Sequence, residues 1–360
     1  MLNLDDLQLI SQIDSKGILS YVEGIDSQID EGVKICEKLI IETGGNNDVI
    51  LNQIVLCGMG GSAVVGDLIR DFLGPDLKVP FLVNRRHTLP FVNSSSCVIL
   101  ASYSGNTEET LSCLRQAEEA QSMIICIASG GRLLDACSRR GIPSVVIPKG
   151  YPPRCAIGFG LIILQMLLSK LSLASSADSK ALKPFIRNQI IKLSPKQPFL
   201  RNRSKKVAAD LFGRVVIVYG SEGHTGSIAK RWASQLAENG KQLAYSSVIP
   251  EMTHNEIVGW NHPEGKLKDL VAVFLRDQED HPQVSKRIDC TFSILKRRAG
   301  LCLEIFSEGL NWSERFWSLV ILGDYTSIYL GILNREDPTP VKEIDELKLR
   351  ADANEIEYED

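Results

Sequence analysis

The stretch Ser102-Tyr-Ser-Gly-Asn-Thr107 decides how the fold of this chain is interpreted. It ends an apolar, β-branched run over residues 97–102 and precedes Glu108-Glu-Thr-Leu, a pattern typical of a strand, a turn and a helix start. In such a unit the backbone N–H groups and the positive end of the helix dipole face one spot. Three hydroxyls at that spot can donate to anion oxygens without adding charge. The stretch therefore predicts a parallel α/β unit with a phosphate-binding loop.

Helix capping alone is a competing explanation, because Thr107 or Asn106 would start a helix well without any ligand. The segment Gly58-Met-Gly-Gly-Ser62 favours a ligand, since it is a second strand end of the same kind. Strand ends on the same side of an α/β sheet are where ligands collect. Two nucleotide-binding motifs do not match this segment well. It lacks the GxxxxGK[ST] pattern of a P-loop, and its glycines do not match the GxGxxG pattern of a dinucleotide-binding loop.

The same alternation of strand, turn and helix recurs along the chain. The segment from Val55 to Ile69 aligns with the segment from Val216 to Lys230, each a strand, a glycine turn and a helix. We therefore expect an α/β fold of two related αβα domains, each with a central, mainly five-stranded parallel sheet flanked by helices. Strands are expected at 53–57, 81–84, 97–102, 123–128 and 144–147 in the first domain, and at 214–220, 242–245 and 270–275 in the second.

The organisation expected from this pattern has five parts. Proline-rich turns after residue 147, an apolar helix at 156–168 and a polar stretch at 172–206 separate the two α/β domains, and a helix is expected at 312–333. The parts are an N-terminal helical segment at 1–50, a first domain at 51–150, a connector with a buried helix at 151–206, a second domain at 207–330 and a C-terminal tail at 331–360.

Composition excludes several classes of protein. The 360 residues are 44% hydrophobic and 23% charged, as in ordinary soluble globular proteins, with a net charge of −4. Residues 1–50 carry ten acidic side chains against three lysines, so we expect no nucleic-acid binding. The N-terminus lacks the pattern of a signal peptide, and the apolar run at 156–168 is too short for a membrane span, so no membrane partner is expected.

The cysteines and histidines predict neither disulfides nor a metal site. Nine cysteines are scattered without a CxxC pair, which indicates reduced thiols in a cytoplasmic protein. The histidines outside His254 have no ligand spacing, so we expect no metal and no cofactor.

Five blocks of sequence carry a family resemblance that runs through both domains. The chain resembles the bifunctional phosphoglucose/phosphomannose isomerase family, within the sugar isomerase (SIS) superfamily. The blocks are Gly58-Met-Gly-Gly-Ser-Ala, Ser102-Tyr-Ser-Gly-Asn-Thr-Glu-Glu-Thr, Pro152-Pro-Arg-Cys-Ala, Leu236-Ala-Glu-Asn-Gly and Pro250-Glu-Met-Thr-His-Asn-Glu-Ile. The resemblance implies metal-independent interconversion of glucose 6-phosphate, mannose 6-phosphate and fructose 6-phosphate through a cis-enediolate. It also implies small sugar phosphates as partners and a homodimer.

The resemblance assigns the proton transfer to Glu238 and the opening of the sugar ring to His254, sixteen residues later. A carboxylate can accept and return the same proton, and an imidazole titrates near neutrality. His254 is expected to come from the neighbouring subunit. Glu256 is the competing base, with Asn255 and Glu251 beside it. Glu238 is preferred because it follows apolar residues at helical spacing.

The resemblance also implies that Arg154 stabilises the enediolate and that a lysine from the tail reaches the site. Lys348 is preferred over Lys342, and a solvated amphipathic helix is an equally good explanation of that tail. The residues expected to hold the substrate phosphate are Gly61, Ser62, Ser102, Ser104 and Thr107.

Two other functions remain open at this point. A non-catalytic SIS-type regulator would need the phosphate cradle but not Glu238, His254 or Arg154, and the acidic N-terminal segment offers no basic helix-turn-helix. The isomerase half of an amino-sugar synthase would follow an amidotransferase domain that begins with cysteine, whereas here Leu2 follows Met1.

Overall fold

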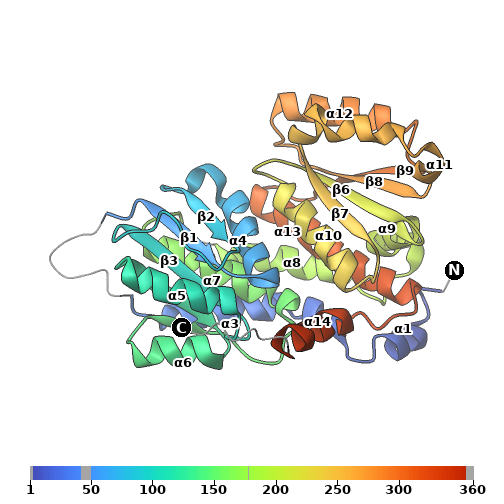
Figure 1. Cartoon of the computed structure of the whole chain (residues 1–360). Helices are drawn as coiled ribbons and strands as arrows, with labels where there is room; N and C mark the ends of the chain where they lie inside the picture. The colour runs from blue at the N-terminus through green and yellow to red at the C-terminus, as the bar shows by residue number, and fades with distance from the viewer. Residues whose placement is uncertain (1–2, 42–49, 177, 354–360) are drawn as a thin grey trace.

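A computed structural model describes residues 3–41, 50–176 and 178–353. Its first sheet has five parallel strands in the order β2-β1-β3-β4-β5 (Figure 1). All five lie within one residue of the expected positions. They are β1 (Gln53–Cys57), β2 (Phe81–Asn84), β3 (Ser96–Ser102), β4 (Met123–Ala128) and β5 (Ser144–Val146).

Helices cover both faces of this sheet because its strands are apolar on both sides. In β1, Ile54 and Leu56 pack in the large core beneath α4 and α7, whereas Val55 and Cys57 face the smaller core under α5 and α6. The helices are α4 (Gly60–Leu73), α5 (Glu108–Glu119), α6 (Gly131–Arg139) and α7 (Ile157–Lys170), with the short turns η1 (Gly74–Asp76) and η2 (Pro153–Cys155).

The second sheet repeats the topology with four parallel strands in the order β7-β6-β8-β9. The expectation of a mainly five-stranded sheet is therefore wrong for this unit, within the part of the chain that the structure describes. Its edge strand β9 was not expected. The strands are β6 (Val215–Ser221), β7 (Ala244–Ile249), β8 (Leu270–Arg276) and β9 (Leu301–Phe306).

Helices again cover both faces of the second sheet. Strand residues Val218 and Val273 join the large core with α10 and α13, and Tyr219 and Phe274 pack with α12 on the other side. The elements are α9 (Arg203–Leu211), α10 (Gly226–Glu238), η4 (Glu251–His254), η5 (Glu256–Asn261), α11 (Glu264–Leu267), α12 (Pro282–Leu295) and α13 (Trp312–Leu333).

The large core continues from one unit into the other, which makes α13 an interior helix. α13 is long and apolar enough to cross a membrane, but its apolar window is 100% buried inside the protein. Such burial is typical of a core helix. The polar stretch of the connector is largely helical, since it forms α8 (Ser179–Leu193), η3 (Phe199–Arg201) and the start of α9.

The N-terminal helices pack on both units, since α2 contacts α13 and α3 contacts α7 (Figure 1). The N-terminal segment forms α1 (Leu7–Ile13), α2 (Ile18–Glu23) and α3 (Ile25–Glu37), and the tail forms α14 (Lys342–Ala353). Residues 42–49 of the expected N-terminal segment and 354–360 of the expected tail lie outside the described residues.

Candidate active site

The loop at 102–107 lies at the point where the strand order of the first sheet reverses. From β1 the chain goes to β2 on one side, and then returns to β3 on the other side of β1. Ligands of open α/β sheets bind beyond the carboxyl ends of the strands at this switch point. Both predicted phosphate-binding segments, after β1 and after β3, lie there.

Hydroxyls inside this loop face one another rather than cap the helix. Ser102 Oγ lies 2.8 Å from Thr107 Oγ1 and accepts a hydrogen bond from the Gly105 N–H at 3.1 Å. Thr107 is the N-cap residue of α5, but its side chain makes no capping hydrogen bond. The capping explanation thus accounts poorly for Thr107, and the first N–H groups of α5 remain available to an anion.

Close packing against the turn after β4 fixes the loop. Gly105 has a φ of 69°, and a Cβ there would lie 1.8 Å from Gly130 O. Asn106 Oδ1 accepts from the Arg132 N–H at 3.1 Å, and Gly105 O accepts from the Leu133 N–H at 2.8 Å. The loop is therefore held in one conformation before any ligand arrives.

The segment after β1 connects the cradle to the proline-arginine block. A Cβ on Gly61 would lie 3.2 Å from the backbone nitrogen of Arg154, which is a tight contact, so the absence of a side chain helps η2 to approach the start of α4 this closely. Ser62 follows in the first turn of α4, half-buried. The predicted phosphate residues Gly61 and Ser62 therefore adjoin the backbone of Arg154.

Arg154 is 5% exposed, and protein groups hold most of its guanidinium. Nε donates to Asn239 Oδ1 at 2.6 Å, and Nη2 donates to the carbonyl oxygens of Pro338 at 3.0 Å and Thr339 at 2.8 Å. Nη1 lies 3.4 Å from Glu238 Oε2. Two predicted site residues from different units, Arg154 and Glu238, thus meet in the folded chain.

Glu238 is the last residue of α10 and keeps 30% of its side chain exposed. Lys241 lies beside it and donates from Nζ to the carbonyl oxygens of Glu238 and Pro340. Burial, followed by the nearby positive charge of Arg154, lowers the pKa of Lys241. Glu238 therefore has two cationic neighbours and an open side.

A buried layer of polar side chains supports this arrangement from α10 and α13. Arg231 Nη2 donates to both carboxylate oxygens of Asp324 at 2.8 Å and to Arg154 O at 3.1 Å. Gln235 Nε2 adds a third hydrogen bond to Asp324 at 2.9 Å, and Asn239 donates to Ser327 Oγ at 3.0 Å. The helix that carries Glu238 is thereby fixed to the core helix.

Sequence reasoning missed several members of this cluster, among them Asn239, Asp324 and Lys241. Asn239 stands inside the quoted block Leu236-Ala-Glu-Asn-Gly, so its neighbour Glu238 could have drawn attention to it. Asp324 is a charge in the middle of an apolar run, which is itself a signal of a buried partner. Lys241 has no sequence signal of its own, because its role depends on the folded position of Pro340.

The remaining predicted residues lie outside this cluster. His254 ends η4 and is exposed, and Lys348 and Lys342 are exposed on α14. Among the described residues, no hydrogen bond or ion pair joins any of the three to Arg154 or Glu238. Ser104 is exposed in the cradle, where its Oγ accepts from the Asn106 N–H at 3.2 Å.

The carboxylate of Glu256, the competing base, is hydrogen-bonded to a residue outside this cluster. Glu256 Oε1 accepts from the Tyr219 hydroxyl at 2.5 Å, and Trp260 Nε1 donates to the same Tyr219 oxygen at 3.0 Å. Burial, together with the negative charge of Glu256, raises the pKa of Tyr219. Glu251 likewise accepts from the Asn255 amide at 2.9 Å. These acids stabilise the loop after β7.

The switch point of the second sheet has different chemistry. Asp277 follows β8 and accepts from Arg315 Nε at 2.9 Å and from the Ser307 hydroxyl, and His224 lies 3.1 Å away. Burial acts to raise the pKa of Asp277, but these hydrogen bonds outweigh it and hold that pKa below its usual range. A carboxylate here disfavours a bound anion, so within the described ranges the first sheet remains the candidate for a phosphate cradle.

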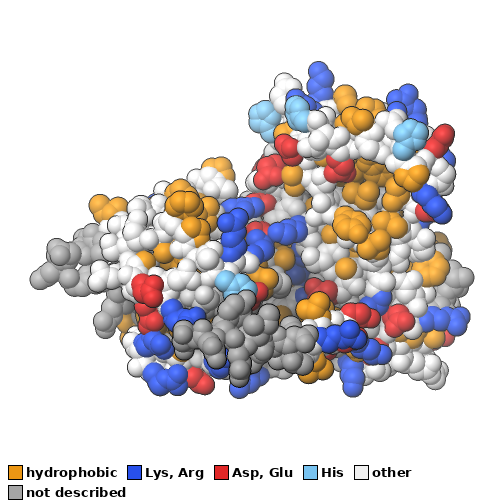
Figure 2. All heavy atoms as spheres, viewed as in Figure 1, with side chains coloured by type: hydrophobic (Ala, Val, Ile, Leu, Met, Phe, Trp, Pro, Cys, Tyr) orange, Lys and Arg blue, Asp and Glu red, His pale blue; other side chains and the backbone are white. Residues whose placement is uncertain are grey.

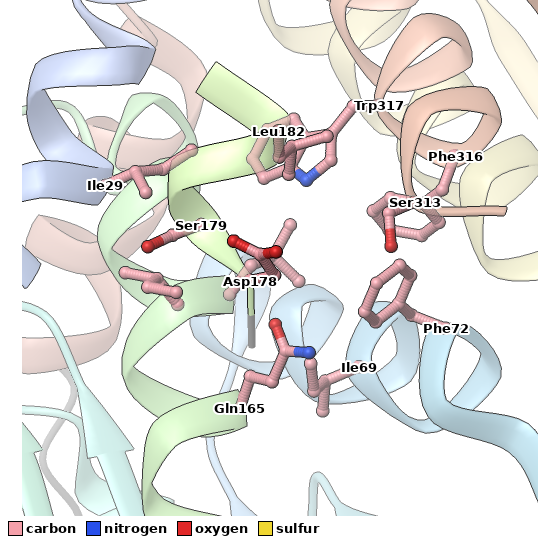
Figure 3. Close-up of a pocket in the computed structure, with 12 residues that line it drawn as sticks. Ile29, Ile69, Phe72, Gln165, Asp178, Ser179, Leu182, Ser313, Phe316 and Trp317 are labelled. Carbon is pink, nitrogen blue, oxygen red and sulfur yellow. The ribbon is translucent and has the colours of Figure 1, made fainter. Parts of the chain in front are cut away.

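A small pocket of about 40 Å³ lies apart from these residues, among α3, α4, α7, α8 and α13 (Figure 3). Gln165, Asp178 and Ser313 line it together with aromatic side chains such as Phe72 and Trp317. The space suffices for a few water molecules but not for a sugar phosphate. By contrast, the surface is hollowed where the two units meet, and Lys and Arg side chains gather there (Figure 2).

Several known proteins are similar to this chain in sequence or in architecture. Residues 200–350 match the model of the bacterial phospho-glucose isomerase C-terminal SIS domain. A bifunctional phosphoglucose/phosphomannose isomerase of Caldicellulosiruptor bescii is 37% identical over 91% of this chain and 96% of its own length. The Aquifex aeolicus protein of the same name is 36% identical over 82% of this chain and 89% of its own. A hypothetical protein from Thermus thermophilus has a solved structure that shares the fold, with a TM-score of 0.73, 16% identity and coverage of 96% and 94% of the two chains. The chain therefore belongs to the bifunctional phosphoglucose/phosphomannose isomerase family.

Proposed function

We propose that this protein is an aldose–ketose isomerase that interconverts glucose 6-phosphate, mannose 6-phosphate and fructose 6-phosphate through a cis-enediolate. The contact between Arg154 and Glu238 beside the phosphate cradle carries the proposal. A regulator that only grips sugar phosphates needs the cradle, but it needs no carboxylate held against a buried guanidinium. The relatives of the same family add weight to the catalytic interpretation.

In this proposal the cradle binds the phosphate end of the substrate. Ser104 and Thr107 donate hydroxyl hydrogens to phosphate oxygens, and the N-termini of α4 and α5 add backbone N–H groups and dipole charge. Gly61 places the backbone of Arg154 next to this end of the substrate. The open-chain sugar then extends from the phosphate toward Glu238.

Glu238 takes the proton from C2 of the aldose and returns it to C1. In the enediolate the proton of the C2 hydroxyl passes to the C1 oxygen, so the C1 aldehyde oxygen becomes a hydroxyl and the C2 oxygen becomes the ketone carbonyl. The guanidinium of Arg154 has its Nε–H and both Nη2–H groups engaged by protein oxygens, which leaves the two hydrogens of Nη1. Nη1 lies against Glu238 and keeps the carboxylate in place, and it has no other partner among the described residues, so its second hydrogen can donate to the enediolate oxygen. Glucose and mannose 6-phosphates differ only at C2, so one enediolate serves both.

His254 opens the sugar ring, and we propose that it does so from the neighbouring subunit of a cytoplasmic homodimer. Its exposure on η4 supports this view, because an exposed loop can reach a partner's site. From the tail, Lys348 is proposed to approach the same site, with Lys342 as the alternative. Neither proposal affects the role of Glu238.

Incubation of the purified protein with fructose 6-phosphate tests the activity directly. Glucose 6-phosphate and mannose 6-phosphate are measured separately, with and without a metal chelator. Formation of both aldoses, unaffected by the chelator, is expected. Binding of fructose 6-phosphate without formation of either aldose would instead identify a regulator.

A further inference from the structure

A pocket of about 380 Å³ opens between the connector and the second unit, outside the proposed active site. Its walls come from the C-terminal part of α8, from η3, from the start of α9, from the loop after β9 and from α13. None of the residues assigned to the isomerase reaction lines it. The volume falls within the range of small-molecule sites, which is about 300 to 1,000 Å³.

The charge of this pocket contrasts with that of the chain. Lys192, Arg201 and Arg203 line it against a single carboxylate, Glu308. The lining thus has two more positive than negative charges, on a protein of net charge −4. Arg203 Nη1 donates to Glu308 Oε1 at 2.8 Å and to Phe306 O at 3.0 Å, so this pair is a fixed part of the wall.

The other two cations have no such partner. Among the described residues, neither Lys192 nor Arg201 forms an ion pair, and both are exposed at the mouth of the pocket. An Arg and a Lys that converge on one hollow suit a phosphate group, because the guanidinium fork donates two parallel hydrogen bonds and the ammonium adds a point charge.

Gln189 marks the inner end of the pocket. It is 4% exposed, and neither atom of its side-chain amide is hydrogen-bonded within the part of the chain that the structure describes. Buried polar groups normally have partners, so this amide is available to a ligand. An amide both donates and accepts, which matches a hydroxyl group.

The walls are rigid enough to hold these groups in place. Lys205 Nζ donates to the carbonyl oxygens of Pro195 at 2.9 Å and Gln197 at 2.8 Å, and Asn202 Nδ2 donates to Leu193 O at 2.9 Å. These bonds fix the loop between α8 and η3. A preorganised pocket loses less conformational entropy when a ligand binds.

We propose that this pocket binds a small phosphorylated metabolite, with its phosphate between Lys192 and Arg201 and a hydroxyl group on the amide of Gln189. The site is independent of the isomerase reaction. It gives the protein a second place at which a phosphate ester is recognised.

Isothermal titration calorimetry of the full chain with glycerol 3-phosphate and with inorganic phosphate tests the proposal. The active-site cradle can also take these probes, so the pocket is identified by comparing variants. K192A/R201A is expected to weaken one binding event at least about tenfold. The matched control K286A/R297A removes the same two charges from exposed positions on and after α12, and it should titrate like the wild-type protein.

Gln189→Leu tests the contribution of the amide to binding separately from that of the two cations. It is expected to weaken binding of glycerol 3-phosphate while leaving inorganic phosphate unchanged, because only glycerol 3-phosphate has alcohol hydroxyl groups beyond its phosphate. Identical titrations of K192A/R201A and the wild-type protein would overturn the site. An equal loss for both probes in Gln189→Leu would overturn the role of the amide. These readouts measure binding alone, so they stand whether or not the isomerase activity is found.

Discussion

Arg154 Nη1 lies 3.4 Å from Glu238 Oε2, although the two residues belong to different units of the chain. The proximity ties Glu238 to the turn that adjoins Gly61 of the proposed phosphate cradle, while 30% of its side chain stays exposed. If Glu238 is the base, Glu238→Gln should lower kcat by about 10³-fold and leave the dissociation constant for fructose 6-phosphate nearly unchanged. Stopped assays together with calorimetry measure both quantities.

The competing base gives this experiment its control. Glu256→Gln removes a carboxylate from a different family block, and in the structure that carboxylate accepts a hydrogen bond from Tyr219, so kcat should stay within a few-fold of the wild-type value. If Glu238→Gln stays active and Glu256→Gln is inactive, the base has been assigned to the wrong residue. The exposed Glu264→Gln reports any general effect of losing a charge.

The stability of the protein should depend on Arg154 as well. Arg154→Met leaves Asn239 Oδ1 and the carbonyl oxygens of Pro338 and Thr339 without their donor, in a site that is nearly closed to water. The free energy of unfolding should fall by about 3 kcal/mol, as measured by urea denaturation.

Arg187→Met is the matched control for that measurement. Arg187 pairs with Asp26, but 61% of its side chain is exposed, so its loss should lower the free energy of unfolding much less than the loss of Arg154 does. Equal losses in the two variants would mean that the hydrogen bonds of Arg154 contribute nothing beyond those of a surface pair.

Much of the first unit could be predicted because parallel strands buried on both faces are nearly continuous apolar runs. β9 (Leu301–Phe306) escaped prediction because it is an edge strand with Glu304 in its middle, and α8 because its sequence is polar and contains Pro184. The family blocks pointed to Arg154 and Glu238 separately. Their contact could not be predicted, since it depends on how two units pack and on the tail at Pro338.

The rigidity of the cradle makes Gly105 a sensitive position. In Gly105→Ala the new Cβ would lie 1.8 Å from Gly130 O, at a φ of 69°. The loop must move, which should cost about 3 kcal/mol and abolish binding of inorganic phosphate to the cradle. Denaturation and calorimetry check the two effects.

Gly141→Ala separates the effect of the steric clash on stability from the effect of the left-handed backbone conformation. Gly141 has nearly the same φ, 68°, but nothing lies within 4 Å of the added Cβ. This variant should lose only about 1 kcal/mol of stability and keep its phosphate binding. If Gly105→Ala behaves like Gly141→Ala, the packing of the loop on Gly130 does not shape the cradle.

The proposed contribution of His254 from a partner subunit can be tested by mixing two inactive variants. Glu238→Gln and His254→Asn homodimers are prepared separately and allowed to exchange subunits. If each site combines Glu238 of one subunit with His254 of the other, a mixed dimer has one site with both substitutions and one site with neither. Random exchange makes half of the dimers mixed, so activity should return to about a quarter of the wild-type value. If both residues act within one subunit, every site in the mixture keeps one substitution and the activity stays at the level of the parent variants. A mixture of either variant with itself, treated in the same way, shows that exchange alone restores nothing.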